Sequence, residues 1–256
     1  QEFSSKSENK KQKETKKSET LNKNLEKFIE KFLANTFKKI DKKQIQIISK
    51  FCKIKKIRKS VSISKGDLEN KKFRFLKKHY CLVKENVCFT FIETNYRKII
   101  IELFYPNSFL DLEFFEILPE ASVVLPRNTE LILIPKNFPE FPEIEEVLKQ
   151  YKIDLESQKK REFLLEIANW KSLDSINRLL YFLYQYLKKS NLYLDNNFVS
   201  LPSKKVISYI TGNSHEVIIR NFKKLEKMNY LVSQGNKIKI NYQKVEQWIK
   251  NSKIIV

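Results

Sequence analysis

The spacing of apolar residues changes once along this chain, and the change limits the folds open to it. From Cys52 to Ile134 the apolar residues fall into short runs with strand-like alternation, bounded by polar residues. Three prolines between residues 135 and 142 close this region. From Glu143 to about Ala168 apolar residues recur three and four positions apart, which predicts one long helix. Short strands at regular spacing are typical of an antiparallel sandwich or barrel, so we expect an α+β protein.

The strands should be joined by turns that rarely use glycine. The expected strands lie within residues 54–63, 73–76, 80–83, 87–92, 98–104, 122–125 and 131–134. The chain has only 3 Gly, so we expect Asn, Asp, Ser and Lys to form most turns. Gly66-Asp67 is the one glycine-containing turn in the strand region.

Helices are expected on both sides of the strand region. Residues 4–20 are polar and lack apolar periodicity, which predicts a disordered tail. A first helix should begin near residues 20–22, and a short second helix should contain residues 45–48. After the long helix, a further one is expected from Leu173 to Leu187, with Ser172 as its N-cap.

The C-terminal segment has its own pattern of helix signals. Ser203 and Ser214 each stand where they can cap a helix, the first about two turns long and the second over residues 215–228. Gly212 allows a tight turn between the two helices. Residues 230–240 predict a β-hairpin, so the order is helix, turn, helix, hairpin.

The charge of the chain points to polyanionic partners. Lys and Arg number 50 against 30 Asp and Glu, a formal net charge of +20. This favours nucleic acid first and an anionic membrane surface second. Residues 201–256 hold eleven basic and three acidic residues, which fits a phosphate-binding surface or a solvated charged face. Residues 38–84 carry a net +14 and residues 102–146 a net −8, so this region could also contact a charged partner protein.

Several functional classes are excluded by what the sequence lacks. It has no glycine-rich phosphate loop, no Ser/His/Asp set, no HExxH motif and no convincing carboxylate pair, so we expect no enzyme and no cofactor. Cys52, Cys81 and Cys88 lack CxxC spacing and predict neither a disulfide, a zinc site nor an iron–sulfur cluster. No apolar run approaches the roughly 20 residues of a membrane span, so we expect a cytoplasmic protein without membrane contact.

The most specific pattern is the segment LPSKKVISYITGNSHEVIIRNFKKLEKMNYL, residues 201–231. Its stretch Ser-His-Glu-Val-Ile-Ile-Arg, residues 214–220, is similar to the Ser-Arg-Glu-x-Val-x-Arg that opens the recognition helix of the CRP/FNR transcription regulators (cyclic-AMP receptor protein and fumarate-nitrate regulator). The order of elements over residues 25–250 resembles the same family. The resemblance implies an N-terminal antiparallel β-roll, a long central dimerisation helix and a C-terminal winged helix-turn-helix.

The resemblance also implies domain limits and a function. The expected domains are a disordered tail at 1–20, a sensor-like β-roll at 21–142, a dimerisation helix at 143–170 and a DNA-binding domain at 171–256. The protein would be a sequence-specific transcription regulator that binds double-stranded DNA as a homodimer, with RNA polymerase as a further partner. Two alternatives are a protein-interaction or ligand-sensing module whose winged helix is structural, and a non-specific basic nucleic-acid-binding protein.

The candidate DNA-binding residues lie mostly on the second helix of this segment. On a helix that starts at His215, residues 215, 216, 219 and 220 share an edge that can reach a major groove. Arg220 would bind a guanine, Glu216 would accept from a cytosine amino group, and Ile219 would contact a thymine methyl group. In competing interpretations Glu216 stabilises the helix dipole, Arg220 binds phosphate, and His215 is partly solvated. The full candidate set is Ser203, Ser214, His215, Glu216, Ile219, Arg220, Lys223, Lys224 and Lys237.

The effector site of the family is expected to be degenerate in this chain. Cyclic-nucleotide-binding members carry a Gly-Glu pair and an Arg-Ser/Thr-Ala that binds phosphate. Alignment places Asp111-Leu112 at the first motif and Pro119 at the arginine, and a phosphate would meet Glu116 and Glu120 without a counter-charge. We therefore expect no control by cyclic nucleotide. The nearby apolar residues would form core or, alternatively, a hydrophobic ligand site: Phe109, Leu110, Phe114, Phe115 and Ile117.

Overall fold

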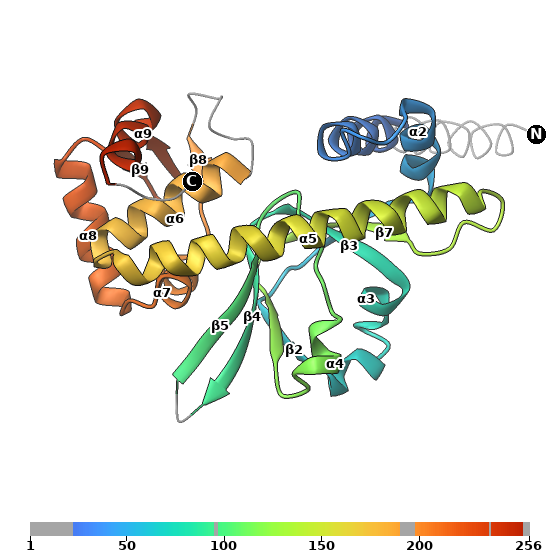
Figure 1. The fold of residues 1–256 in the computed structure, drawn as a ribbon, viewed down its shortest axis with the longest axis horizontal. Helices are drawn as coiled ribbons and strands as arrows, with labels where there is room; N and C mark the ends of the chain where they lie inside the picture. The colour runs from blue at the N-terminus through green and yellow to red at the C-terminus, as the bar shows by residue number, and fades with distance from the viewer. Residues whose placement is uncertain (1–22, 95–96, 190–197, 236, 253–256) are drawn as a thin grey trace, which may run out of the picture.

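The computed structural model describes residues 23–94, 97–189, 198–235 and 237–252, and it arranges them around one long helix (Figure 1). This helix, α5 (Pro142–Ser172), passes over the β-strands and carries the C-terminal helices at one end and α2 near the other. The structure is therefore α+β, as expected. The proposed tail at residues 1–20 lies outside the described residues.

Two antiparallel sheets form the β-roll. The first has strand order β1-β7-β3, made of β1 (Lys53–Lys56), β7 (Glu130–Pro135) and β3 (His79–Glu85). The second has order β2-β6-β4-β5, made of β2 (Val61–Ser64), β6 (Ser122–Leu125), β4 (Cys88–Thr94) and β5 (Arg97–Phe104). Fully buried side chains from both sheets, among them Ile63, Val83, Val123 and Leu131, form a common core. Burial of this apolar area holds the two sheets together.

Asparagine takes the turn positions that glycine fills in most proteins. Asn86, Asn107, Asn128 and Asn229 have positive φ angles of 78°, 68°, 67° and 57°. Asparagine tolerates the left-handed region better than other non-glycine residues because its short polar side chain can bond locally. The expectation drawn from the low glycine content is confirmed at these turns.

The strand expected at residues 73–76 is wrong. After the short helix η1 (Gly66–Glu69), these residues begin α3 (Arg74–Lys78), in which Leu76 is buried. A run of four residues with three apolar side chains fits one helical turn as well as a short strand, so packing decides between them. A second short helix, α4 (Phe114–Ile117), lies before β6.

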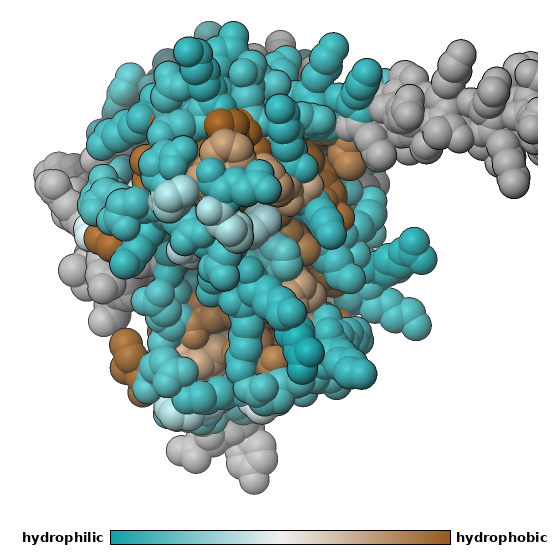
Figure 2. All heavy atoms as spheres, turned by 90° about the vertical axis from the view of Figure 1, so that its right-hand side faces the viewer, coloured by the Kyte–Doolittle hydropathy of each residue, from teal (hydrophilic) through white to brown (hydrophobic). Residues whose placement is uncertain are grey.

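The N-terminal helices pack against the start of α5. Residues 23–36 are helical, and α2 (Lys42–Phe51) follows with Asp41 as its N-cap. Buried residues of both helices share a core with Ile144 and Leu148 of α5. Figure 2 shows this end of the molecule, where polar side chains cover most of the surface.

The C-terminal domain contains more helix than the sequence predicted. Its elements are α6 (Ser175–Lys189), β8 (Val199–Ser200), α7 (Lys204–Thr211), α8 (His215–Lys227), β9 (Leu231–Gln234), β10 (Lys237–Ile240) and α9 (Tyr242–Asn251). The helix α9 was not expected from the sequence. The expected N-cap of α6 is wrong: the Asn177 amide donates to Asp174 Oδ1 at 2.9 Å, whereas the Ser172 hydroxyl donates back to Asn169 O at 2.8 Å.

The β-roll and the C-terminal domain share one apolar core. Val87 and Tyr105 of the β-roll are buried in the same cluster as Leu183 and Leu187 of α6, and Leu103 packs against that cluster. A joint core of this kind restrains the orientation of the two domains. Within the described residues, none of the helices has the length and apolar character needed to span a membrane.

Candidate nucleic-acid interface

The start of α8 is set by local signals. Ser214 precedes the helix in an extended conformation, and its Oγ accepts a hydrogen bond from the Val217 amide at 3.3 Å. Gly212 ends α7 in the left-handed conformation with φ 63°, which a larger side chain would strain. Ser203 caps α7 in the same way, because its Oγ accepts from the Val206 amide at 3.3 Å. Both predicted caps and the turn between them are confirmed.

One face of α8 is buried against α7. Ile218, Phe222 and Leu225, which are spaced four and three residues apart on the helix, lie in the same core cluster as Ile207 and Ile210. This contact leaves the opposite face of α8 for solvent or for a partner.

A polar anchor of α8 was not predicted. Asn221 is buried, and its Nδ2 donates to Ser175 Oγ at the start of α6, at 3.3 Å. Asn213 reaches the same residue, since its Nδ2 lies 3.4 Å from Ser175 O. The partners in these two hydrogen bonds are separated in the sequence by 38 and 46 positions. No local pattern could therefore indicate them.

The exposed face of α8 carries the candidate reading edge. His215, Glu216, Arg220 and Lys223 are exposed, and Ile219 is half-buried. With 3.6 residues per turn these positions lie on one side of the helix, opposite the buried residues. Lys224 is also exposed, at the border of this edge. The structure thus brings six of the nine candidate residues together on one helix surface.

Glu216 is engaged by the N-terminus of its own helix. A hydrogen bond from its own backbone N–H, followed by one from the Ser214 hydroxyl, holds the pKa of the Glu216 carboxyl below its usual range. The carboxylate therefore stabilises the first turn, as one of the two interpretations stated. It remains solvent-exposed and so is accessible to a base.

Of the other three candidates, Ser214 is the N-cap of α8, and Lys237 and Ser203 lie on other elements. Lys237 is exposed on β10, where it pairs with Gln234 across the hairpin, so it belongs to the wing. Ser203 lines a cavity that the C-terminal domain shares with the β-roll, and the structure does not group it with the α8 residues. Lys204 and Lys205 are exposed in the first turn of α7 and add positive charge to this domain.

The segment aligned with the family's phosphate site is occupied by internal contacts. Lys152 of α5 lies 3.8 Å from Asp111 Oδ1, and Lys65 lies 3.3 Å from Glu116 Oε2. Asp111 and Glu116 are thus each paired with a lysine of the same chain. Within the described residues, no cluster of metal-ligating side chains is found.

The apolar residues of this segment divide into two groups. Phe109, Leu110 and Phe115 are buried in the cores of the β-roll, which confirms the core interpretation for them. Ile117 is 81% exposed, so the core interpretation is wrong for this residue. The side chain of Phe114 lies outside the described part of the structure.

Comparisons with known proteins add the last observation. No protein-family model matches this chain, and no curated protein matches it. FixK2 from Bradyrhizobium japonicum has a similar structure, with a TM-score of 0.56 and 13% identity over 77% of this chain and 95% of that chain. A transcriptional regulator of the CRP/FNR family from Thermus thermophilus is similar with a TM-score of 0.50 and 15% identity over 78% of this chain and 98% of its own. A variant of CooA from Carboxydothermus hydrogenoformans is similar with a TM-score of 0.51 and 12% identity over 78% and 88%.

Proposed function

Because the chain has the fold of the CRP/FNR transcription regulators, we propose that it is a transcription regulator that reads DNA sequence through α8. The observation that carries the proposal is the two-sided character of this helix. Its apolar face is buried against α7, while Glu216, Arg220 and Lys223 are exposed on the other side. A helix held in this way by a helix-turn-helix can enter a major groove.

Arg220 is the residue on which sequence discrimination should depend. Its guanidinium is exposed and forms no ion pair with the described residues, so it is free to bind a guanine through two hydrogen bonds. The lysines at positions 204, 205, 223, 224 and 237 would contact phosphates and supply affinity without discrimination.

We assign residues 21–142 to the β-roll, 143–170 to a dimerisation helix and 171–256 to the DNA-binding domain. α5 is 31 residues long, and Ile153 on its surface is 47% exposed. Pairing of two α5 helices would cover this apolar position and place two α8 helices about one helical turn of DNA, roughly 10 bp, apart. Sedimentation equilibrium should therefore give a dimer.

The sharpest test selects binding sites from random duplex DNA and then compares variants on the selected site. Arg220→Ala should weaken binding to that site by about 1–3 kcal/mol and relax selectivity at one base pair. Arg74→Ala is the matched control, because Arg74 is an exposed arginine on α3, outside the candidate interface. Equal weakening on every sequence would make Arg220 a phosphate contact.

The alternative functions predict different results in the same assays. A non-specific nucleic-acid-binding protein would show a strong salt dependence and select no site. A protein-interaction module would bind DNA equally well after Arg220→Ala and Glu216→Ala, and would lose its function on charge changes within residues 102–146. Either result would overturn the proposal.

We also propose that cyclic nucleotides do not control this protein. Pro119 occupies the aligned arginine position, and Asp111 and Glu116 are paired with lysines of the same chain. A ligand shifts a conformational equilibrium only through differential contacts with the two states, and a phosphate has no counter-charge of its own here. Calorimetric titration with cyclic AMP and cyclic GMP should show no saturable binding at micromolar concentration.

A further inference from the structure

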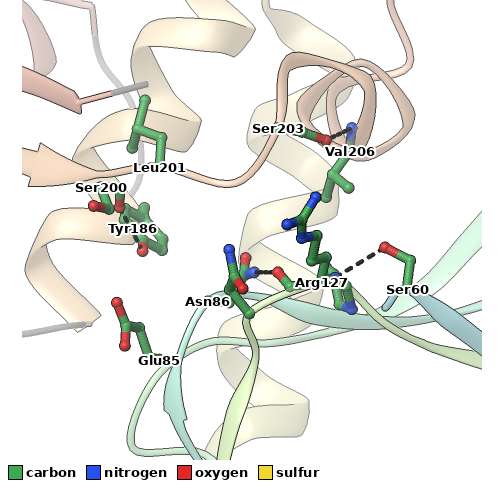
Figure 3. Close-up of a pocket in the computed structure, with 11 residues that line it drawn as sticks. Ser60, Glu85, Asn86, Arg127, Tyr186, Ser200, Leu201, Ser203 and Val206 are labelled. Atoms are coloured by element: carbon green, nitrogen blue, oxygen red, sulfur yellow. Dashed lines mark hydrogen bonds between the residues drawn. The ribbon is translucent and has the colours of Figure 1, made fainter. Parts of the chain in front are cut away.

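A cavity of about 270 Å³, lined mostly by polar residues, lies where the β-roll meets the C-terminal domain (Figure 3). The turn between β3 and β4 and the turn between β6 and β7 form its floor, and Tyr186 of α6 and the first turn of α7 form its opposite wall. Ligand sites are found preferentially at domain boundaries of this kind.

Arg127 provides a positive charge at this cavity. Its backbone is fixed by two hydrogen bonds, because its N–H donates to Ser60 Oγ at 2.9 Å and its carbonyl accepts from Asn86 Nδ2 at 3.0 Å. Its side chain rises toward Ser203 and the first turn of α7 in Figure 3, and it forms no ion pair within the described chain. The positive end of the α7 dipole faces the same space, so an anion placed here would interact favourably with both.

Glu85 provides a negative charge on the other side, near Tyr186. The Tyr186 hydroxyl donates to Ser200 O at 3.1 Å. Glu85 and Tyr186 line the same side of the cavity in Figure 3. Burial raises the pKa of Tyr186, and the charge of Glu85 raises it further. Glu85 is exposed and also lacks an ion pair among the described residues. The cavity thus presents unpaired opposite charges on two sides.

From this arrangement we propose that the cavity binds a small zwitterion of the amino-acid class, with its carboxylate at Arg127 and its ammonium group at Glu85. The volume is below the roughly 300–1,000 Å³ of pockets for drug-sized molecules, which fits a ligand of this size. Asn86 and Ser203 line the same space and offer neutral polar groups to it.

A ligand in this cavity would touch both the β-roll and α7. α7 packs directly against α8, so the ligand would favour the domain orientation seen here over any other. We therefore expect the bound zwitterion to change the affinity of the chain for DNA. This step rests on the proposed function.

The first experiment measures ligand binding without DNA. The full-length chain is titrated with each standard amino acid by thermal shift and calorimetry, alongside the matching carboxylates without an amino group and amines without a carboxylate. At least one amino acid should raise Tm in a saturable manner, and both analogues should bind about tenfold more weakly, because each loses one charge-assisted contact.

Charge-neutralising variants then locate the site. Arg127→Gln should weaken the binding of the amino acid and of the carboxylate analogue. Glu85→Gln should weaken the binding of the amino acid and leave that of the carboxylate analogue unchanged. Arg74→Gln is the control, because Arg74 is an exposed arginine on α3, and it should change the binding of neither ligand. In gel shifts, the amino acid should alter the DNA affinity of the native chain and leave that of Arg127→Gln unaltered.

The outcomes that oppose the proposal are distinct. The site would be overturned, whatever the DNA assays show, if no standard amino acid bound in a saturable manner. It would also be overturned if Arg127→Gln bound the amino acid as well as the native chain does. If the carboxylate analogue bound as tightly as the amino acid, the cavity would be an anion site, and the proposal of a zwitterionic ligand would be refuted. Weaker DNA binding by Arg127→Gln with no amino-acid binding would make Arg127 a phosphate contact, and binding without a change in DNA affinity would refute the regulatory step alone.

Discussion

Asn107 joins three parts of the fold, and its replacement tests how they are held together. Its Nδ2 donates to Lys189 O at 3.1 Å, which satisfies a carbonyl at the C-terminal end of α6. Its Oδ1 accepts from Thr36 Oγ1 at 3.0 Å, at the end of the N-terminal helix. Its backbone has a φ of 68°, in the left-handed region. We expect Asn107→Ala to remove both hydrogen bonds and to add backbone strain.

The size of the effect follows from these three contributions. A typical net hydrogen bond contributes about 0.5–1.5 kcal/mol. The Thr36 bond should lie at the lower end, because the single hydroxyl hydrogen is shared with Phe32 O at 2.9 Å. Left-handed backbone costs an alanine about 1–2 kcal/mol. Asn107→Ala should therefore lower the free energy of unfolding by about 2–4 kcal/mol.

Urea denaturation of four variants separates the contributions. Asn107→Gly relieves the strain but loses conformational entropy, so it should be less destabilising than Asn107→Ala by about 1 kcal/mol or less. Asn128 is the matched control, because it is exposed with φ 67° and forms no side-chain hydrogen bond with the described residues. Asn128→Ala should show the backbone effect alone, and Asn128→Gly should be close to native. If Asn107→Ala costs no more than Asn128→Ala, the two side-chain bonds contribute nothing and the reasoning is refuted.

Three further outcomes test the site and the core. Ser214→Ala should destabilise the chain by about 1 kcal/mol and weaken DNA binding, whereas Ser214→Asp should keep the cap; equal loss in both would disprove the capping role. The lowered pKa of Glu216 means that its carboxylate stabilises the fold above its ordinary pKa and that this stability is lost as pH falls through the lower folded value. In urea titrations, the native chain should accordingly have a higher free energy of unfolding than Glu216→Gln at pH 7, and this difference should vanish in acid. An NMR titration midpoint of Glu216 at or above the ordinary value would contradict this. Burial raises the pKa of Cys52, Cys81 and Cys88 to about 12. All three thiols should therefore resist Ellman's reagent at pH 8 until the chain is denatured. Rapid reaction of the folded chain would show that they are accessible.

The features predicted best are those whose signals are local. Ser203, Gly212 and Ser214 mark the ends of α7 and α8 within a few residues, because caps and left-handed turns depend on adjacent backbone groups. The exposure of Arg220 and the burial of Phe222 follow from helical periodicity alone.

The errors occurred where local signals were equivocal or misread. Residues 73–76 fit a strand and a helical turn equally well, and packing of Leu76 selected the helix. Ser172 and Asp174 are both good N-cap residues, and the bend after α5 decided between them. The spacing of Val245, Trp248 and Ile249 is helical, so α9 could be predicted from the sequence as well.

The sequence by itself determined most of the element types, the caps of α7 and α8, the exposed edge of α8 and the positive charge of its domain, because each depends on residues close together in the chain. Only the tertiary structure decided which distant segments meet. The cavity joins turns at residues 85–86 and 126–128 with Tyr186 and the start of α7, and Asn107 reaches across 82 residues to α6. Such contacts depend on the packing free energy of the whole chain, which no short pattern encodes. For that reason α8 could be proposed as a DNA-reading helix from sequence, while the site between the domains required the fold.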